Sequence, residues 1–99
     1  MITEAPKPPK HLSAEMKAFW KSTNHEYALA ADAVLTLQTA CEQYDRMQQA
    51  RQKIAANGIT IDGKRNPACD VEKVAVSLFL RSLRALGLDV VAPGQKKHA

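Results

Sequence analysis

The chain is 99 residues long, with 45% hydrophobic residues, 24% charged residues and a formal net charge of +4. This length supports a single domain, and no apolar run reaches the roughly 18 residues that a membrane-spanning helix needs. Residues 1–10 lack the apolar core of a secretory signal, so we expect a cytoplasmic protein with no membrane partner. The mild positive charge is compatible with nucleic acid as a partner.

The N-terminal segment predicts an arm followed by a short helix. Residues 1–11 hold three prolines and two lysines, which is typical of an extended, solvated arm. Ser13 is placed to cap the following helix, and apolar residues then recur at helical spacing as far as Trp20. The polar residues 23–25 are expected to end this helix.

A long helix is predicted from Ala28 to Asn57, with Gly58 as its stop signal. Between Ala28 and Cys41 nearly the whole circumference is apolar, and such a helix is packed on more than one side. A chain of this length offers little material to cover both sides, so we expect a neighbouring subunit as the second cover. The predicted interface residues are Leu29, Val34, Leu35, Leu37 and Cys41.

A connector and a third helix complete the predicted domain. In residues 58–65, the β-prone Ile-Thr-Ile run and the Asp-Gly turn pair favour a short hairpin. Asn66 and Pro67 predict the cap and first position of a helix that ends at Gly87 in a Schellman motif. The expected core face of this helix consists of Val71, Val74, Ala75, Leu78, Leu83 and Leu86.

These elements predict an all-α fold. A short N-terminal helix, one long helix and a third helix pack as a helical hairpin or bundle, which we expect to assemble into a ring. The predicted organisation is a flexible basic, proline-rich arm over residues 1–11, one helical domain over 12–88 and a flexible tail over 89–99.

No catalytic residue, metal site or cofactor is predicted. The sequence has no phosphate loop, and its histidines have no metal-ligand spacing to either cysteine, so Cys41 and Cys69 are expected as buried free thiols. Glu42 and Asp45 could be imagined as a nuclease carboxylate pair. Glu42 also stands four residues before Arg46, a spacing that favours a surface ion pair, and we prefer a solvated or inter-subunit role for both carboxylates.

Three groups of cations are candidates for contact with DNA. Cations held on a helix can match a row of phosphates, which dominate affinity for DNA. The first group is Lys73, Arg81 and Arg84, whose spacing places them on one stripe away from the expected core face. An ordinary solvated face is the alternative interpretation of each group. The second group is Arg51, Lys53, Lys64 and Arg65, and the third is Lys7, Lys10, Lys17 and Lys21.

Three segments resemble the phage terminase small subunit family. The run PPKHLSAEMKAFW is similar to the family's opening, and LTLQTACEQYDRMQQA is similar to its second element. The segment NPACDVEKVAVSLFLRSLRALGLD resembles the family's Asn-Pro start and Leu-Gly-Leu finish. The likeness covers roughly residues 8 to 89. The sequence departs from the family after residue 89, where it lacks the usual Thr-Pro and arginine-bearing tail.

The resemblance implies a non-catalytic subunit of an ATPase–nuclease complex. Such a subunit binds double-stranded phage DNA at the packaging initiation site, forms a homo-oligomeric ring and recruits or regulates the terminase large subunit in the bacterial host cell. Two other classes remain open. A helix-turn-helix DNA-binding regulator would usually be a dimer on palindromic half-sites. A protein-binding helical adaptor would show no salt-dependent affinity for DNA.

Overall fold

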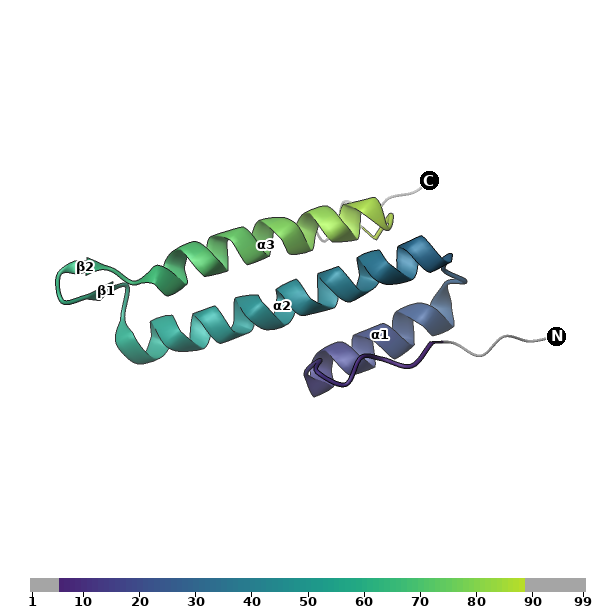
Figure 1. Ribbon diagram of the computed structural model, residues 1–99, viewed down its shortest axis with the longest axis horizontal. Coiled ribbons are helices and arrows are strands. Elements are labelled where there is room, and N and C mark those ends of the chain that lie inside the picture. Colours follow the sequence, from purple (N-terminus) through teal and green to yellow (C-terminus); the bar gives the residue numbers. More distant parts are fainter. Residues whose placement is uncertain (1–5, 89–99) are drawn as a thin grey trace, which may run out of the picture.

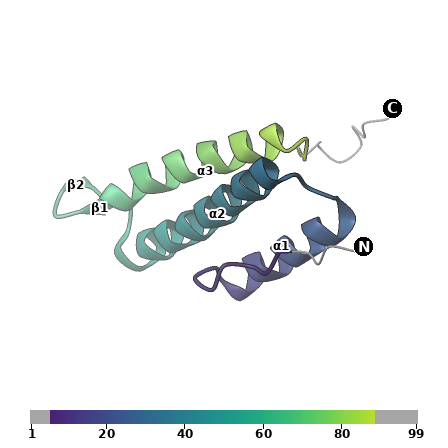
Figure 2. The same cartoon turned by 45° about the vertical axis from the view of Figure 1, so that its right-hand side comes forward.

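The protein folds into three helices and a small β-hairpin, seen in a computed structural model that describes residues 6–88. The two longer helices, α2 and α3, run antiparallel side by side, and α1 folds back along the first half of α2 (Figure 1). A view turned by 45° shows α1 and α3 against different sides of α2 (Figure 2). The predicted all-α helical hairpin is confirmed. The elements are α1 (Ala14–Glu26), α2 (Ala31–Asn57), β1 (Thr60–Ile61), β2 (Lys64–Arg65) and α3 (Pro67–Ala85).

The ends of the helices follow the capping signals in the sequence, with one difference. Ser13 caps α1, because its side chain accepts a hydrogen bond from the backbone N–H of Met16. α2 begins at Ala31 rather than at the predicted Ala28. The backbone is extended at Tyr27 and again at Ala30, because the chain must reverse direction between α1 and α2. A high helical propensity in this segment is therefore overridden by the turn.

The C-terminus of α3 closes in the predicted Schellman motif. Gly87 adopts a φ of 76°, in the left-handed region that favours glycine. The N–H of Leu88 donates to the carbonyl of Leu83 at 2.8 Å, and the N–H of Gly87 donates to that of Arg84 at 3.0 Å. These bonds satisfy two carbonyl groups that the end of the helix would otherwise leave without a backbone partner.

The core between α1 and α2 is built around Trp20. Its side chain is 2% exposed and packs with Met16 of α1 and with Leu37 and Cys41 of α2, which are fully buried. The indole N–H donates to the carbonyl of Pro6 at 2.8 Å. Buried tryptophan nitrogens usually find such a partner. Here the bond holds the described part of the N-terminal arm against the helical domain.

The predicted interface residues fall into two environments. Leu37 and Cys41 have no exposed surface, because α1 covers them within the same chain. For these two residues the chain itself supplies the second cover that we expected from a neighbouring subunit. Leu29 and Val34 pack partly against the same core, whereas Leu35 is 66% exposed. Leu35 is thus the predicted interface residue with most surface left for a partner.

The predicted core face of α3 is partly wrong. Ala75 and Leu83 are buried, but Val71 and Val74 are 41% and 56% exposed. The apolar positions of α3 span much of its circumference, so the sequence pattern alone did not determine which part faces α2. The side of α3 that faces α2 carries small buried residues, Ala68, Cys69 and Ala75. The ring of Phe79 packs at a tilt against the ring of Tyr44, with centroids 5.4 Å apart.

The connection between α2 and α3 is the short hairpin that the sequence predicted. Thr60 pairs with Arg65, and Ile61 with Lys64. The two turn residues, Asp62 and Gly63, both have positive φ (52° and 78°), as a two-residue type I′ turn requires. The hairpin projects beyond the ends of both helices (Figure 1).

Asn66 joins this hairpin to both helices. Its side-chain oxygen accepts from the N–H of Ala68 at 2.9 Å and caps α3. Its side-chain nitrogen donates to the carbonyl of Gly58, just after α2, at 2.8 Å. The residue is 4% exposed, so neither bond competes strongly with water.

Replacing Asn66 with Ala is expected to lower the free energy of unfolding by about 1–3 kcal/mol, because the cap is lost and a carbonyl loses its partner. Urea denaturation followed by circular dichroism measures the change. Asn66→Ser is the matched control: its hydroxyl can still accept from the Ala68 N–H as a helix cap but is too short to replace the bond to Gly58, so its loss should be smaller. Equal stability of Asn66→Ala and the wild type would show that the two bonds contribute nothing.

Candidate nucleic-acid interface

The end of the domain that carries the β-hairpin gathers cations from three elements. A hollow of about 660 Å³ is lined by Arg51 of α2, Arg65 of β2 and Lys73 of α3. The sequence had placed these residues in two separate groups. Two of the three are engaged in ion pairs: Arg51 Nε lies 2.9 Å from Glu72, and Arg65 Nε lies 3.3 Å from Asp70. These acids offset part of the positive charge on this flank.

The outer surface of α3 carries the first predicted group. Lys73, Arg81 and Arg84 are all exposed. Their spacing places them on one stripe, opposite the side on which Ala75 and Leu83 are buried. Lys73 and Arg81 form no ion pair with any residue between 6 and 88. This row can therefore present positive charge to a polyanion without first breaking an ion pair at those two positions.

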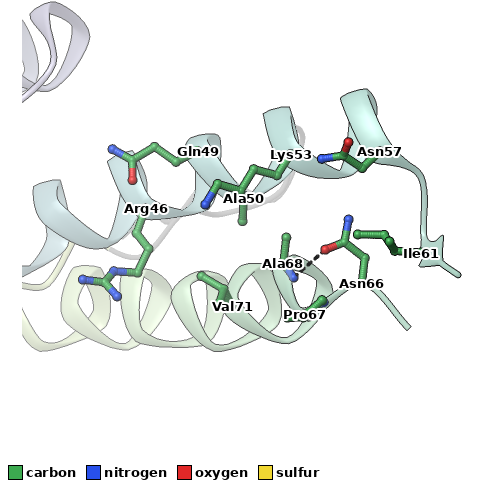
Figure 3. A pocket seen from close by; sticks show the side chains of 10 residues that line it. All are labelled: Arg46, Gln49, Ala50, Lys53, Asn57, Ile61, Asn66, Pro67, Ala68 and Val71. Carbon is green, nitrogen blue, oxygen red and sulfur yellow. Dashed lines mark hydrogen bonds between the residues drawn. The ribbon is translucent and has the colours of Figure 1, made fainter. Parts of the chain in front are cut away.

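A second hollow, of about 680 Å³, lies between α2 and the start of α3, where it is lined by Arg46, Gln49, Lys53 and Asn57 (Figure 3). Arg46 was not among the predicted DNA contacts, because its spacing from Glu42 suggested an ion pair. No ion pair joins the two residues in the structure, and Glu42 instead bonds to His11. The signal that could have identified Arg46 is the helical spacing of four hydrogen-bond donors along α2.

The remaining predicted cations are not brought into one site. Lys64 is exposed on β2, at the projecting hairpin. Lys17 is half-buried and Lys21 is exposed on α1, which lies along the opposite half of α2 from the β-hairpin (Figure 1). Lys7 and Lys10 are exposed in the segment before α1. The third predicted group is therefore spatially separate from the cations at the hairpin end.

The carboxylates Glu42 and Asp45 hold the start of α1 onto α2. Asp45 accepts hydrogen bonds from the backbone N–H of Ser13 at 2.8 Å and from its hydroxyl at 2.6 Å. Glu42 lies 2.8 Å from His11 Nε2 and accepts from the side chain of Gln38 at 3.0 Å. No group of three or more metal-ligating side chains gathers within the described part of the chain. Glu42 and Asp45 are therefore structural residues that join α2 to the start of α1 and the segment before it.

Cys41 is a structural thiol. Burial raises its pKa to about 12, and the nearby Asp45 and Glu42 carboxylates add to the effect. A thiol is nucleophilic as the thiolate, so Cys41 is unreactive while it is buried. Cys69 is also buried and free.

Hydrogen bonds lower the pKa of Glu42. The bond from Gln38 is the largest cause, the bond to His11 contributes, and Arg46 adds a weaker electrostatic effect. A carboxylate with a lowered folded-state pKa stabilises the protein above its unfolded value and loses that contribution as the pH falls through the folded value. The ordinary value is 4.5, so the loss is confined to more acidic solution.

We expect Glu42→Gln to be less stable than the wild type at neutral pH, and the difference to shrink as the pH falls below about 4.5. Urea denaturation at a series of pH values from 7 to 3 measures it. Other carboxylates also titrate in this range, so the comparison between the two proteins is the informative quantity. Two stability curves that stay parallel over the whole range would contradict the assignment.

Comparison with known proteins identifies one family. The family model described as phage terminase, small subunit, matches residues 14–96, which include every helix from the start of α1 to the end of α3. No curated protein and no solved structure matches the chain. No helix within residues 6–88 is long and apolar enough to cross a bilayer.

Proposed function

Because the chain belongs to the phage terminase small subunit family, whose role is phage DNA packaging, we propose that it binds double-stranded viral DNA where packaging starts. In this proposal the chain performs no catalysis. It recruits or regulates the large subunit, which holds the ATPase and nuclease, in the cytoplasm of the bacterial host. The family match over residues 14–96 is the observation that carries the proposal.

The exposed row on α3 is the first DNA contact that we propose. Lys73, Arg81 and Arg84 project from one rigid helix, so little conformational entropy is lost when they meet phosphates. Contacts of this kind position a protein on DNA without reading its sequence. Each subunit would bind weakly, and several subunits on one DNA would raise the total affinity.

The arrangement of the helices favours this function over a helix-turn-helix regulator. In that motif the two helices cross at about 90–120° around a short turn, and the second helix enters the major groove. Here α1 folds back along α2, and α2 is a 27-residue helix that packs along its length against α3 (Figures 1 and 2). A purely protein-binding adaptor would show no salt-dependent affinity for DNA, so DNA binding measured at several salt concentrations distinguishes it from the proposed function.

Changing Arg81 and Arg84 together to Ala is expected to weaken binding to any duplex DNA and to flatten the salt dependence by about one unit per lost phosphate contact. Fluorescence anisotropy of a labelled 30-base-pair duplex, at several salt concentrations, measures both quantities. Arg81→Lys with Arg84→Lys is the first control, because it keeps the charge and should keep most of the slope.

Lys17→Ala with Lys21→Ala removes the same formal charge from α1 and should have the smaller effect. An unchanged affinity and slope in the Arg81/Arg84 variant would show that the α3 row is an ordinary solvated face. Equal losses in the α1 and α3 variants would show that net charge, not this row, controls binding.

We also propose a homo-oligomeric ring in which exposed apolar side chains meet. Leu35 on α2 and Val74 on α3 are 66% and 56% exposed, and a ring needs two different patches to meet in a heterologous contact. Light scattering at micromolar concentration should show an assembly larger than a dimer. Leu35→Asp or Val74→Asp should reduce its mass without unfolding the chain, because both side chains point into solvent. A wild-type monomer across this range would contradict the ring.

A further inference from the structure

We propose that the hollow between α2 and the start of α3 is a second DNA-binding site, and that it takes the phosphodiester backbone of one strand. This inference rests on the proposed function, because it assumes that DNA is the polyanion the chain meets. The site is separate from the α3 row. Its cation Arg46 belongs to none of the groups identified in the sequence, and Gln49 is a neutral donor. Figure 3 shows Arg46 extending from α2 toward α3, while the side chains of Gln49 and Lys53 run along α2.

The chemistry of the lining is that of an anion site. Every polar side chain that lines the hollow is a cation or a carboxamide, and no carboxylate lines it. Arg46 and Lys53 supply two positive charges, and Gln49 and Asn57 supply neutral N–H donors. The third carboxamide of the lining, Asn66, already uses both its side-chain oxygen and its side-chain nitrogen in hydrogen bonds that stabilise the fold. The four α2 side chains are therefore the ones available to a ligand.

The spacing of these donors suits a repeating ligand. Arg46, Gln49, Lys53 and Asn57 recur at helical intervals along one stripe of α2. A rise of about 1.5 Å per residue spreads them over about 16 Å. Successive phosphates of one strand are about 3.4 Å apart along the duplex axis, so the row can follow several of them.

The charge of this hollow is less neutralised than that of the opposite flank. There, Arg51 and Arg65 are paired with Glu72 and Asp70. Neither Arg46 nor Lys53 forms an ion pair with any residue in the described range 6–88. The two carboxylates that precede Arg46 on α2 have other partners: Asp45 bonds to Ser13, and Glu42 bonds to Gln38 and His11. Phosphate binding here requires no ion pair to break.

The apolar part of the lining strengthens the site. Ala50, Ile61, Pro67 and Val71 complete the hollow beside the donors. Low-dielectric walls around a cluster of one charge sign focus its field and raise the local concentration of counter-ions. The same walls can contact deoxyribose, which carries most of the apolar surface on the outside of a DNA strand.

The test compares two double variants by anisotropy of the labelled 30-base-pair duplex. Arg46→Ala with Lys53→Ala should weaken binding and lower the magnitude of the salt slope by about two, since two phosphate contacts are lost. Gln49→Ala with Asn57→Ala should weaken binding less and leave the slope unchanged, because neutral donors displace no counter-ions. Weaker binding by the Gln49/Asn57 variant at an unchanged slope is what a merely basic surface would not produce, because such a surface does not use neutral donors. Both variants are expected to fold, because the four replaced side chains are exposed or line an open hollow. Circular dichroism checks this expectation.

The outcomes separate this inference from the proposed function. If the wild type shows no salt-dependent binding to the duplex, the proposed DNA-binding function fails and the inference fails with it. If the wild type binds and the Arg46/Lys53 variant binds with the same affinity and slope, only the inference is overturned. The inference is also overturned if that variant keeps its DNA affinity but loses capture of the purified large subunit, which would assign the hollow to an acidic protein segment.

Discussion

The packing of α2 on two sides is the constraint on which the rest of the domain depends. Its first half is apolar around most of its circumference, and such a helix is stable in water only while other elements cover it. α1 covers one side through Trp20, Leu37 and Cys41, and α3 covers another along its whole length. Because α1 depends on a few large side chains, the hydrogen bonds from Ser13 to Asp45 help to fix its start on α2.

The sequence predicted local structure well because local structure depends on short-range chemistry. The cap at Ser13, the Asp-Gly turn and the Schellman end at Gly87 each depend on backbone geometry that only a few residue types favour. It predicted less well what depends on neighbours. α2 begins at Ala31, later than predicted, because the chain must turn before it. α3 faces α2 with the small residues Ala68, Cys69 and Ala75 instead of the predicted Val71 and Val74.

The candidate site shows the same division. Helical spacing was enough to predict that Lys73, Arg81 and Arg84 share one exposed stripe. It could not show that Arg51 and Lys73 line the same hollow from two helices, or that Glu72 would pair with Arg51. Arg46 was missed for a related reason. Its expected partner, Glu42, bonds instead to Gln38 on the same helix and to His11 before α1, and the spacing within one helix cannot reveal the bond to His11.

Because α1 buries Cys41, the reactivity of this thiol depends on the contact between α1 and α2. In the folded protein it is fully buried with a pKa of about 12, so it is neither accessible nor ionised near neutral pH. If α1 lifts from α2, the thiol becomes accessible and loses the burial that is the largest cause of its raised pKa, while Asp45 and Glu42 stay beside it on α2. Rates of alkylation at Cys41 therefore report the openings, local or global, that expose it. In an assembly whose α1 helices rearrange, Cys41 would be alkylated faster.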